Sequence, residues 1–163
     1  TQIVGPPCAV WARLATLVND IETEDSAAIT LRWSYGALAT VSATLGSAQE
    51  ITRHRFTFEN LSAESGTDPY YSSFEPWVFT PIEEHAEKIQ AALDDYVPGK
   101  EDYIGQFERY ADSRAAGTPP PVQLADARQA LELVTALYLS DREHREVSLP
   151  LPADEPALNG WEP

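Results

Sequence analysis

The 163-residue sequence has one cysteine and two lysines, and no apolar run in it approaches the roughly 20 residues that cross a bilayer. The single cysteine, Cys8, cannot form an internal disulfide, so nothing in the composition asks for an oxidising compartment. The first residues also lack the basic start and apolar block of a secretory signal. These absences predict a cytoplasmic protein that does not span a membrane.

Positive charge is also scarce. Eleven lysines and arginines stand against 26 aspartates and glutamates, which gives a formal net charge of -15. Such a surface repels nucleic-acid phosphates and anionic lipid headgroups, and no basic cluster offsets it. The sequence therefore predicts neither a nucleic-acid nor a membrane partner.

The common catalytic motifs are missing as well. No glycine-rich loop of the kinds that hold nucleotide or dinucleotide phosphates is present, and neither a G-x-S-x-G nor an H-E-x-x-H motif occurs. Cys8 and the three histidines, His54, His85 and His144, do not have metal-ligand spacing. By themselves, the residues predict a module without a complete catalytic apparatus and without a metal site.

The first third of the chain reads as strands. Residues 8–18 alternate in side-chain character after two prolines, and residues 24–58 contain three extended segments separated near Gly36 and Gly46. In the first of these segments every second residue, from Ala27 to Trp33, is apolar, which indicates one buried face. The second segment, residues 38–45, carries no charge, a pattern typical of a strand inside a sheet covered on both sides.

Later residues read mainly as helices. A short strand is expected at residues 61–64, and residues 74–81, which are flanked by prolines, are expected to form an edge strand or an ordered loop. Helices are expected at 82–96, 103–116 and 124–139, followed by a last strand with Val147. Asp102 is the expected cap of the second helix and Gly117 its stop. The expected apolar stripes are Ala86, Ile89 and Leu93; Ile104, Phe107 and Ala111; and Leu124, Ala127, Leu131, Val134 and Leu137 or Tyr138. Strands gathered early and helices gathered late predict a single α+β domain with an antiparallel sheet.

Four stretches together resemble a known family. They are E-D-S-A-A-I-T-L-R-W-S-Y-G from Glu24, the G-T-P-P-P-V link from Gly117, the helix A-R-Q-A-L-E-L-V-T-A-L-Y-L-S from Ala127, and V-S-L-P-L from Val147. With them, nearly the whole chain resembles the C-terminal domain of the glucose-fructose oxidoreductase and inositol dehydrogenase (Gfo/Idh/MocA) family.

The resemblance implies a fold and a role. In that family an N-terminal Rossmann domain binds NAD(P), while an open antiparallel sheet backed by helices on one face shapes a sugar or polyol pocket and packs against a partner subunit. The family's E-K-P lysine motif and D-x-x-x-H helix are both absent here, so the resemblance assigns no catalytic residue to this chain. It implies residues 1–163 as one substrate-binding and dimerisation domain, without the Rossmann domain and inactive alone, with NAD or NADP bound only by the complete enzyme.

The sequence departs from the family in two places. Gln123 stands where the family often has a Thr or Ser that caps the following helix, so that cap is lost unless Asp126 or water replaces it. Near the end, Glu155 and Leu158 stand where the family commonly has a histidine and a tyrosine.

Arginines and aromatic residues on the expected strands are the candidate binding residues. Planar guanidinium groups and aromatic rings suit polyhydroxylated ligands, but the same residue types are enriched in oligomer interfaces, which is the interpretation we favour. An aromatic loop, with two tyrosines and a tryptophan, could reach the mouth of a pocket or cover the sheet edge. The candidate substrate residues are Trp11, Arg13, Arg53, His54, Arg55, Tyr70, Tyr71 and Trp77.

Three functions remain open from the sequence. The first is the substrate-side and oligomerisation domain of an NAD(P)-dependent sugar or polyol oxidoreductase that forms a homo-oligomer through the open sheet face. The second is a free-standing, non-enzymatic assembly or ligand-binding module derived from that domain. The third is a cofactor-independent isomerase or lyase that uses a carboxylate with His54 on the open face.

Overall fold

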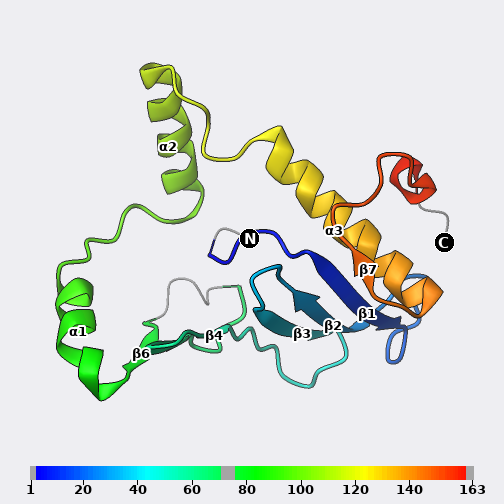
Figure 1. The fold of residues 1–163 in the computed structure, drawn as a ribbon, viewed down its shortest axis with the longest axis horizontal. Helices are drawn as coiled ribbons and strands as arrows, with labels where there is room; N and C mark the ends of the chain where they lie inside the picture. The colour runs from blue at the N-terminus through cyan, green and yellow to red at the C-terminus, as the bar shows by residue number, and fades with distance from the viewer. Residues whose placement is uncertain (1–2, 71–75, 161–163) are drawn as a thin grey trace. The chain divides into compact units, whose positions relative to one another are not determined.

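A computed structural model describes residues 3–70 and 76–160 (Figure 1). The chain divides into two compact units. Unit 1 comprises Thr1–Ser47 and Val122–Pro163, and unit 2 comprises Ala48–Pro121. Every strand pair in the described residues is antiparallel, and both sheets are open. The predicted α+β class with an open antiparallel sheet is therefore confirmed. No helix within the described residues is long and apolar enough to cross a membrane.

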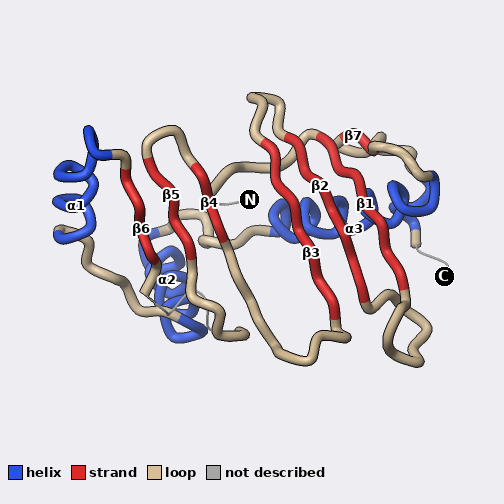
Figure 2. The backbone as a smooth tube through the Cα atoms, turned by 90° about the horizontal axis from the view of Figure 1, so that it is seen from below, coloured by secondary structure: helices blue, strands red, loops and turns tan. Residues whose placement is uncertain are grey.

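Unit 1 contains a four-stranded sheet in the order β3-β2-β1-β7 (Figure 2). Its strands are β1 (Ala9–Ala15), β2 (Ser26–Arg32), β3 (Leu38–Thr44) and β7 (Val147–Ser148). Gly36 turns the β2–β3 hairpin at φ 98°, a conformation that favours glycine. Gly46 is needed for a different reason, because a Cβ there would clash with the side chain of Val18.

Helix α3 (Leu124–Glu143) covers one face of this sheet, packing mainly against β1. The core between them contains Val10, Ala136, Leu139, Val147 and Leu151. After α3, the chain forms β7 and ends in a short 3-10 helix, Pro156–Asn159, which also packs on α3. At the start of α3, Asp126 accepts a 2.7 Å hydrogen bond from the backbone N–H of Gln123, the contact that the third helical residue makes in a capping box.

The predicted apolar stripe of α3 is confirmed at its end, where Leu137 packs against the core, but it is wrong in the first half of the helix. Leu124 is 90% exposed and Leu131 64% exposed, whereas Ala136 and Ser140 are fully buried. The reason is that α3 lies close to the backbone of β1, because the Ser140 hydroxyl accepts a 2.9 Å hydrogen bond from the Ala12 backbone N–H. Small side chains of the helix therefore face the strand. The helix is therefore oriented by a polar contact to the open edge of β1, where β7 no longer pairs.

The expectation that residues 38–45 form an interior strand is also wrong. β3 is the end strand of its sheet in the described structure, and Val41 on the face toward α3 is 43% exposed. Its lack of charge reflects small hydroxyl and alanine side chains, not burial on both faces.

Unit 2 contains a three-stranded sheet in the order β4-β5-β6, with β4 (Arg55–Thr57), β5 (Leu61–Glu64) and β6 (Val78–Pro81). The short strand at residues 61–64 and the edge position of β6 were both predicted correctly. The third strand predicted within residues 24–58 is shorter than expected and pairs with β5.

Two helices follow in unit 2. A 3-10 turn, Glu83–His85, leads into α1 (Ala86–Asp94), whose half-buried residues are the predicted Ala86, Ile89 and Leu93. Helix α2 (Asp102–Ala116) ends at Gly117, with φ 65°, as predicted. Asp102 is not its cap, because it already lies inside the helix and no side chain caps this end. Ile104 and Phe107, predicted as buried, are 64% and 66% exposed.

Candidate functional site

One candidate surface is the face of β1, β2 and β3 that lies opposite α3, which we call the open face. Val10 and Ala12 are buried on the side toward α3, so the alternate residues Trp11 and Arg13 lie on the open face. The Trp11 side chain is 40% exposed there. The Arg13 guanidinium lies 6.0 Å from the centre of the Trp11 ring, a cation–π distance. The two predicted residues of unit 1 are therefore brought together.

Arg13 is held by the end of α3. Its guanidinium donates to the Asp141 carbonyl, lies 3.6 Å from the Asp141 carboxylate, and contacts Nδ1 of His144. His144 adopts the left-handed conformation that ends α3, and this places its ring beside Arg13. Three contacts fix the position of Arg13, although the side chain remains about half exposed.

Small hydroxyl side chains make up much of the open face. Thr30 and Thr40 lie in register with Trp11, and Ser42 lies in register with Arg13 through Ala28. At the end of the same face, the hydroxyls of Ser26 and Thr44 are 3.3 Å apart. The sequence analysis did not select these hydroxyls, although the alternation along residues 26–44 was the signal that could have placed them on this face.

A second arginine, Arg32, lies at the other end of the open face. It donates to Glu146 at 2.7 Å, and this hydrogen bond lowers the pKa of the Glu146 carboxyl and raises that of Arg32. Both side chains are about half exposed, so the pair contributes little to stability. Its effect is to neutralise the charge of Arg32 at the edge of the open face.

The sheet of unit 2 brings other predicted residues together. The His54 and Trp77 rings stack with centres 6.4 Å apart and planes 6° apart, and Trp77 also stacks on Phe56 at 5.9 Å. Phe56 in turn stacks on Phe58 at 6.4 Å. We call these four side chains the aromatic row. Phe56 and Trp77 are half-buried, whereas His54 and Phe58 are exposed, so the row can take part in stacking with a flat apolar ligand surface.

Arg55 lies on the face of β4 opposite Phe56, because residues alternate between faces along a strand, and Arg53 lies two residues before this strand begins. Arg53 is paired with Glu64, to which its Nε donates at 2.6 Å. The structure thus separates these arginines from His54. It also places all three in unit 2, whereas Trp11 and Arg13 belong to unit 1.

The aromatic loop is described only in part. Tyr70 is 82% exposed and has φ 69°. Tyr71 lies outside the described residues. Trp77, at the end of this loop, is the member that joins the aromatic row.

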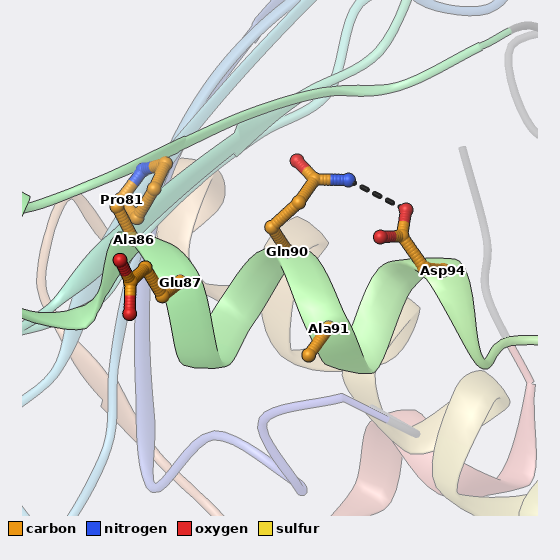
Figure 3. Close-up of a pocket in the computed structure, with 6 residues that line it drawn as sticks. All are labelled: Pro81, Ala86, Glu87, Gln90, Ala91 and Asp94. Atoms are coloured by element: carbon orange, nitrogen blue, oxygen red, sulfur yellow. Dashed lines mark hydrogen bonds between the residues drawn. The ribbon is translucent and has the colours of Figure 1, made fainter.

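A shallow hollow lies on α1 in unit 2 (Figure 3). Its lining is Pro81, Ala86, Glu87, Gln90, Ala91 and Asp94. The amide of Gln90 donates to Asp94 at 2.8 Å, and both charged groups in the lining are carboxylates. The negative charge of the lining therefore disfavours an anionic ligand in the hollow, and none of the predicted binding residues lines it.

The described residues do not supply a metal centre or a cofactor cradle. No group of three or more His, Cys, Asp or Glu side chains converges within them. Their strands pair only antiparallel, so the parallel β-α-β unit that binds dinucleotides is not found in this part of the chain.

Two polar groups with shifted pKa values are structural. The buried carboxylate of Asp25 accepts hydrogen bonds from the backbone N–H groups of Leu17, Val18 and Asn19, which lower its pKa far below the usual range. The Tyr138 hydroxyl donates to both oxygens of Glu24 at 2.7 Å, and this raises the Tyr138 pKa to about 12. Both contacts fix the β1–β2 loop, and Tyr138 ties it to α3.

Solved structures show the same fold. The WlbA dehydrogenases of Bordetella pertussis and Chromobacterium violaceum, both solved with NADH and UDP-GlcNAcA, are each 25% identical, with TM-scores of 0.68 and 0.66. Each match covers 91% of this chain and 42% of the other. The chain has the fold of the C-terminal domain of Gfo/Idh/MocA-type oxidoreductases.

Other matches of the Gfo/Idh/MocA type extend this result. The aldose-aldose oxidoreductase of Caulobacter crescentus, solved with glycerol, matches with a TM-score of 0.66 at 21% identity, over 88% of this chain and 42% of its own. The chain thus spans less than half the length of these structures, and both of its units have counterparts in them. No family model matches the chain, and no curated protein sequence matches it significantly.

Proposed function

We propose that this chain is the substrate-side and oligomerisation domain of an NAD(P)-dependent sugar or polyol oxidoreductase, and that it is catalytically incomplete alone. The observation that carries the proposal is the match over 91% of the chain to less than half of two dehydrogenases that were solved with NADH and a nucleotide sugar. Residues 1–163 then act as one functional domain. The cytoplasmic location stays a prediction from the sequence.

The cofactor belongs to another part of the complete enzyme in this proposal. NAD(P) accepts or donates a hydride, but the described residues do not form the cradle that would hold it, so we assign no step of hydride transfer to this chain. Its task is to bind and orient a polyhydroxylated substrate, which lowers the entropic cost of reaction.

Substrate contact is assigned to the predicted residues that carry rings or guanidinium groups. The aromatic row, through His54 and Trp77, offers rings on which the apolar face of a sugar can stack. Trp11, Arg13, Arg53, Arg55, Tyr70 and Tyr71 stay candidates for the same role. In the complete enzyme, Trp77→Ala should raise KM for the sugar with little change in kcat, while an unchanged KM would remove Trp77 from the proposed site.

The open face is the proposed contact with a second copy. It combines Trp11 and Arg13, two residue types enriched at interfaces, with small uncharged hydroxyl side chains on β2 and β3. Thr40→Arg would place a long charged side chain in this contact. Val41→Arg makes the same change at the next residue on the opposite face, and so serves as its control.

Light scattering after size-exclusion chromatography tests the contact. We expect the wild-type chain and the Val41→Arg variant to be dimeric and the Thr40→Arg variant to be monomeric. A wild-type chain that is monomeric at micromolar concentration would contradict the oligomerisation role.

The enzymatic role has its own test. Titration of NADH or NADPH into this chain should leave the nicotinamide fluorescence unchanged, and the product of the complete reading frame should reduce NAD or NADP with at least one sugar or polyol. Micromolar cofactor binding by this chain would overturn the proposed division of labour.

A free-standing binding module is the second candidate. It is favoured by unit 1, which has its own core and an open face without a catalytic group. A nucleotide-binding half encoded directly upstream in the same reading frame would argue strongly against it.

A further inference from the structure

The end of α3 places a histidine against the arginine of the open face. His144 has φ 57° as the residue that ends α3, and its Nδ1 contacts a guanidinium nitrogen of Arg13 on β1. The same guanidinium donates to the carbonyl of Asp141 and lies 6.0 Å from the centre of the Trp11 ring. The position of Arg13 on the open face therefore depends in part on a side chain that can change its charge.

The contact between Arg13 and His144 exists in only one protonation state of the histidine. A guanidinium group stays protonated and has five N–H donors but no acceptor. Nδ1 of His144 must therefore accept through its lone pair, which requires a neutral ring with its proton on Nε2. When Nδ1 also takes up a proton, two donors and two positive charges face each other, and the contact is lost.

The other charged groups around His144 keep their charge in the range where a histidine titrates. From β1 the ring faces Arg13, and on α3 the Asp141 carboxylate lies 3.6 Å from Arg13 and accepts the Leu14 backbone N–H at 3.0 Å. The neighbours in sequence are Arg142, Glu143, Arg145 and Glu146, of which Glu143 pairs with Arg145, and Glu146 with Arg32 of β2. Carboxylates and guanidinium groups ordinarily stay ionised between pH 8 and about pH 5.5, whereas a histidine ordinarily has a pKa of about 6.5. Of these groups, His144 is therefore the one whose charge changes in that range.

We propose that His144 is a positioning residue for Arg13, and that its protonation weakens the contact of the open face with a second copy of this chain. The inference rests on the proposed function, which supplies that contact. Neutral His144 restrains the long Arg13 side chain before association, so less rotamer freedom is lost when the second copy binds. Protonation removes this restraint and should raise the dissociation constant of the dimer roughly three- to tenfold.

The overall charge acts in the opposite direction. Two copies that each carry a net charge of -15 repel each other, and acid reduces this repulsion. Overall charge alone therefore predicts a tighter dimer at low pH, in the wild-type chain and in its variants alike. The test must compare the wild-type chain with a variant that keeps an acceptor at residue 144 but cannot be protonated there.

Asparagine at residue 144 provides this variant. Its side-chain oxygen follows the same number of bonds from the backbone as Nδ1 and accepts a hydrogen bond at any pH, and asparagine tolerates a positive φ. His144→Asn should therefore keep the contact with Arg13 in acid. His144→Gly also fits the backbone but offers no acceptor, so its dimer should be weak at both pH values. His85→Asn, in unit 2, removes a different histidine and serves as the matched control.

Sedimentation equilibrium of the 163-residue chain at pH 8 and pH 5.5 measures the dissociation constants. Between these pH values the ratio of the two constants should be roughly three- to tenfold larger for the wild-type chain and His85→Asn than for His144→Asn. At pH 8, His144→Gly should already show the weaker association. The same ratio in the wild-type chain and His144→Asn would overturn the inference.

The ring nitrogens of His144 report on the Arg13 contact without a dimer. Nitrogen-15 spectra should show the ring proton on Nε2 at pH 8, and a proton on Nδ1 at that pH would overturn the inference, because Nδ1 could not accept from Arg13. A chain that is monomeric at both pH values would contradict the proposed second-copy contact and the regulation with it. A proton on Nε2 would then show that the failure lies in the contact between copies and not in the pairing of His144 with Arg13.

Discussion

Helices α3 and α2 were predicted from the same kind of evidence, yet among the described residues α3 packs on the sheet of its own unit and α2 does not. α3 buries Ala136, Leu139 and Ser140 against β1 in unit 1, while α2 leaves its large apolar residues exposed in unit 2. The difference shows that a stripe of large apolar residues does not fix which face is buried. Small residues and a hydroxyl that reaches the strand backbone decide it in α3.

The largest expected effect concerns two leucines of α3. Leu139→Ala should destabilise unit 1 by about 3 kcal/mol, because the side chain is 7% exposed in the core and its removal leaves a cavity. Leu131→Ala, at a residue that is 64% exposed, should cost less than about 0.5 kcal/mol. Urea unfolding followed by circular dichroism measures both. Equal costs would mean that the predicted stripe, and not the observed face, packs on the sheet.

Asp25→Asn should have the next largest effect, lowering the Tm by roughly 5 °C or more. The carboxylate accepts three backbone N–H groups, and an amide cannot accept them all. Because the folded pKa is below the unfolded value of about 3.9, its contribution is present above that pH and is lost as pH falls below it. Wild-type stability should therefore decline more steeply than that of the variant below about pH 4. Parallel pH profiles would contradict this role.

Tyr138→Phe should cost about 1 kcal/mol, because it leaves the Glu24 carboxylate without the hydroxyl donor. The folded pKa of about 12 lies above the usual value of about 10, so this stabilisation is complete below pH 10 and is lost between pH 10 and 12. Thermal unfolding between pH 7 and 11 should show the difference between wild type and variant shrinking as pH rises. A constant difference would indicate that the hydroxyl is not the cause.

The smallest global effect is expected from Gly117→Ala. Gly117 has φ 65°, which costs a residue with a Cβ about 1 kcal/mol, but this cost should fall on α2 alone. We expect faster hydrogen exchange in the last turn of α2 and no change in the unfolding of unit 1. A shift in the Tm of unit 1 would show that the two regions are coupled more closely than we infer.

The positions of the strands were predicted better than the place of β3 in its sheet and the cap of α2. The alternation from Ala27 to Trp33 placed the buried face of β2, and the turn residues around Leu61–Glu64 fixed β5, because both signals are local. The edge position of β3 was missed, since an uncharged strand can be interior or simply small-sided. Asp102 failed as a cap because the helix begins at that residue.

The candidate binding residues were also predictable only in part. Their side-chain types were visible in the sequence, as was the alternation that separates His54 from Arg53 and Arg55. The contacts were not: Arg13 meets Asp141 and His144 across more than 120 residues, and Trp77 meets His54 across 23. Such pairings depend on strand order and on how the helix end reaches the strand edge.

The sequence by itself determined the α+β class, the positions of the three helices, the edge strand β6 and the resemblance to one half of an oxidoreductase, because periodicity, turn residues and charge are properties of neighbouring residues. Only the tertiary structure decided which face of α3 is buried, which residues form the open face and which helix packs on the sheet of its own unit. Those outcomes depend on small side chains and backbone hydrogen bonds that become important only when distant segments meet.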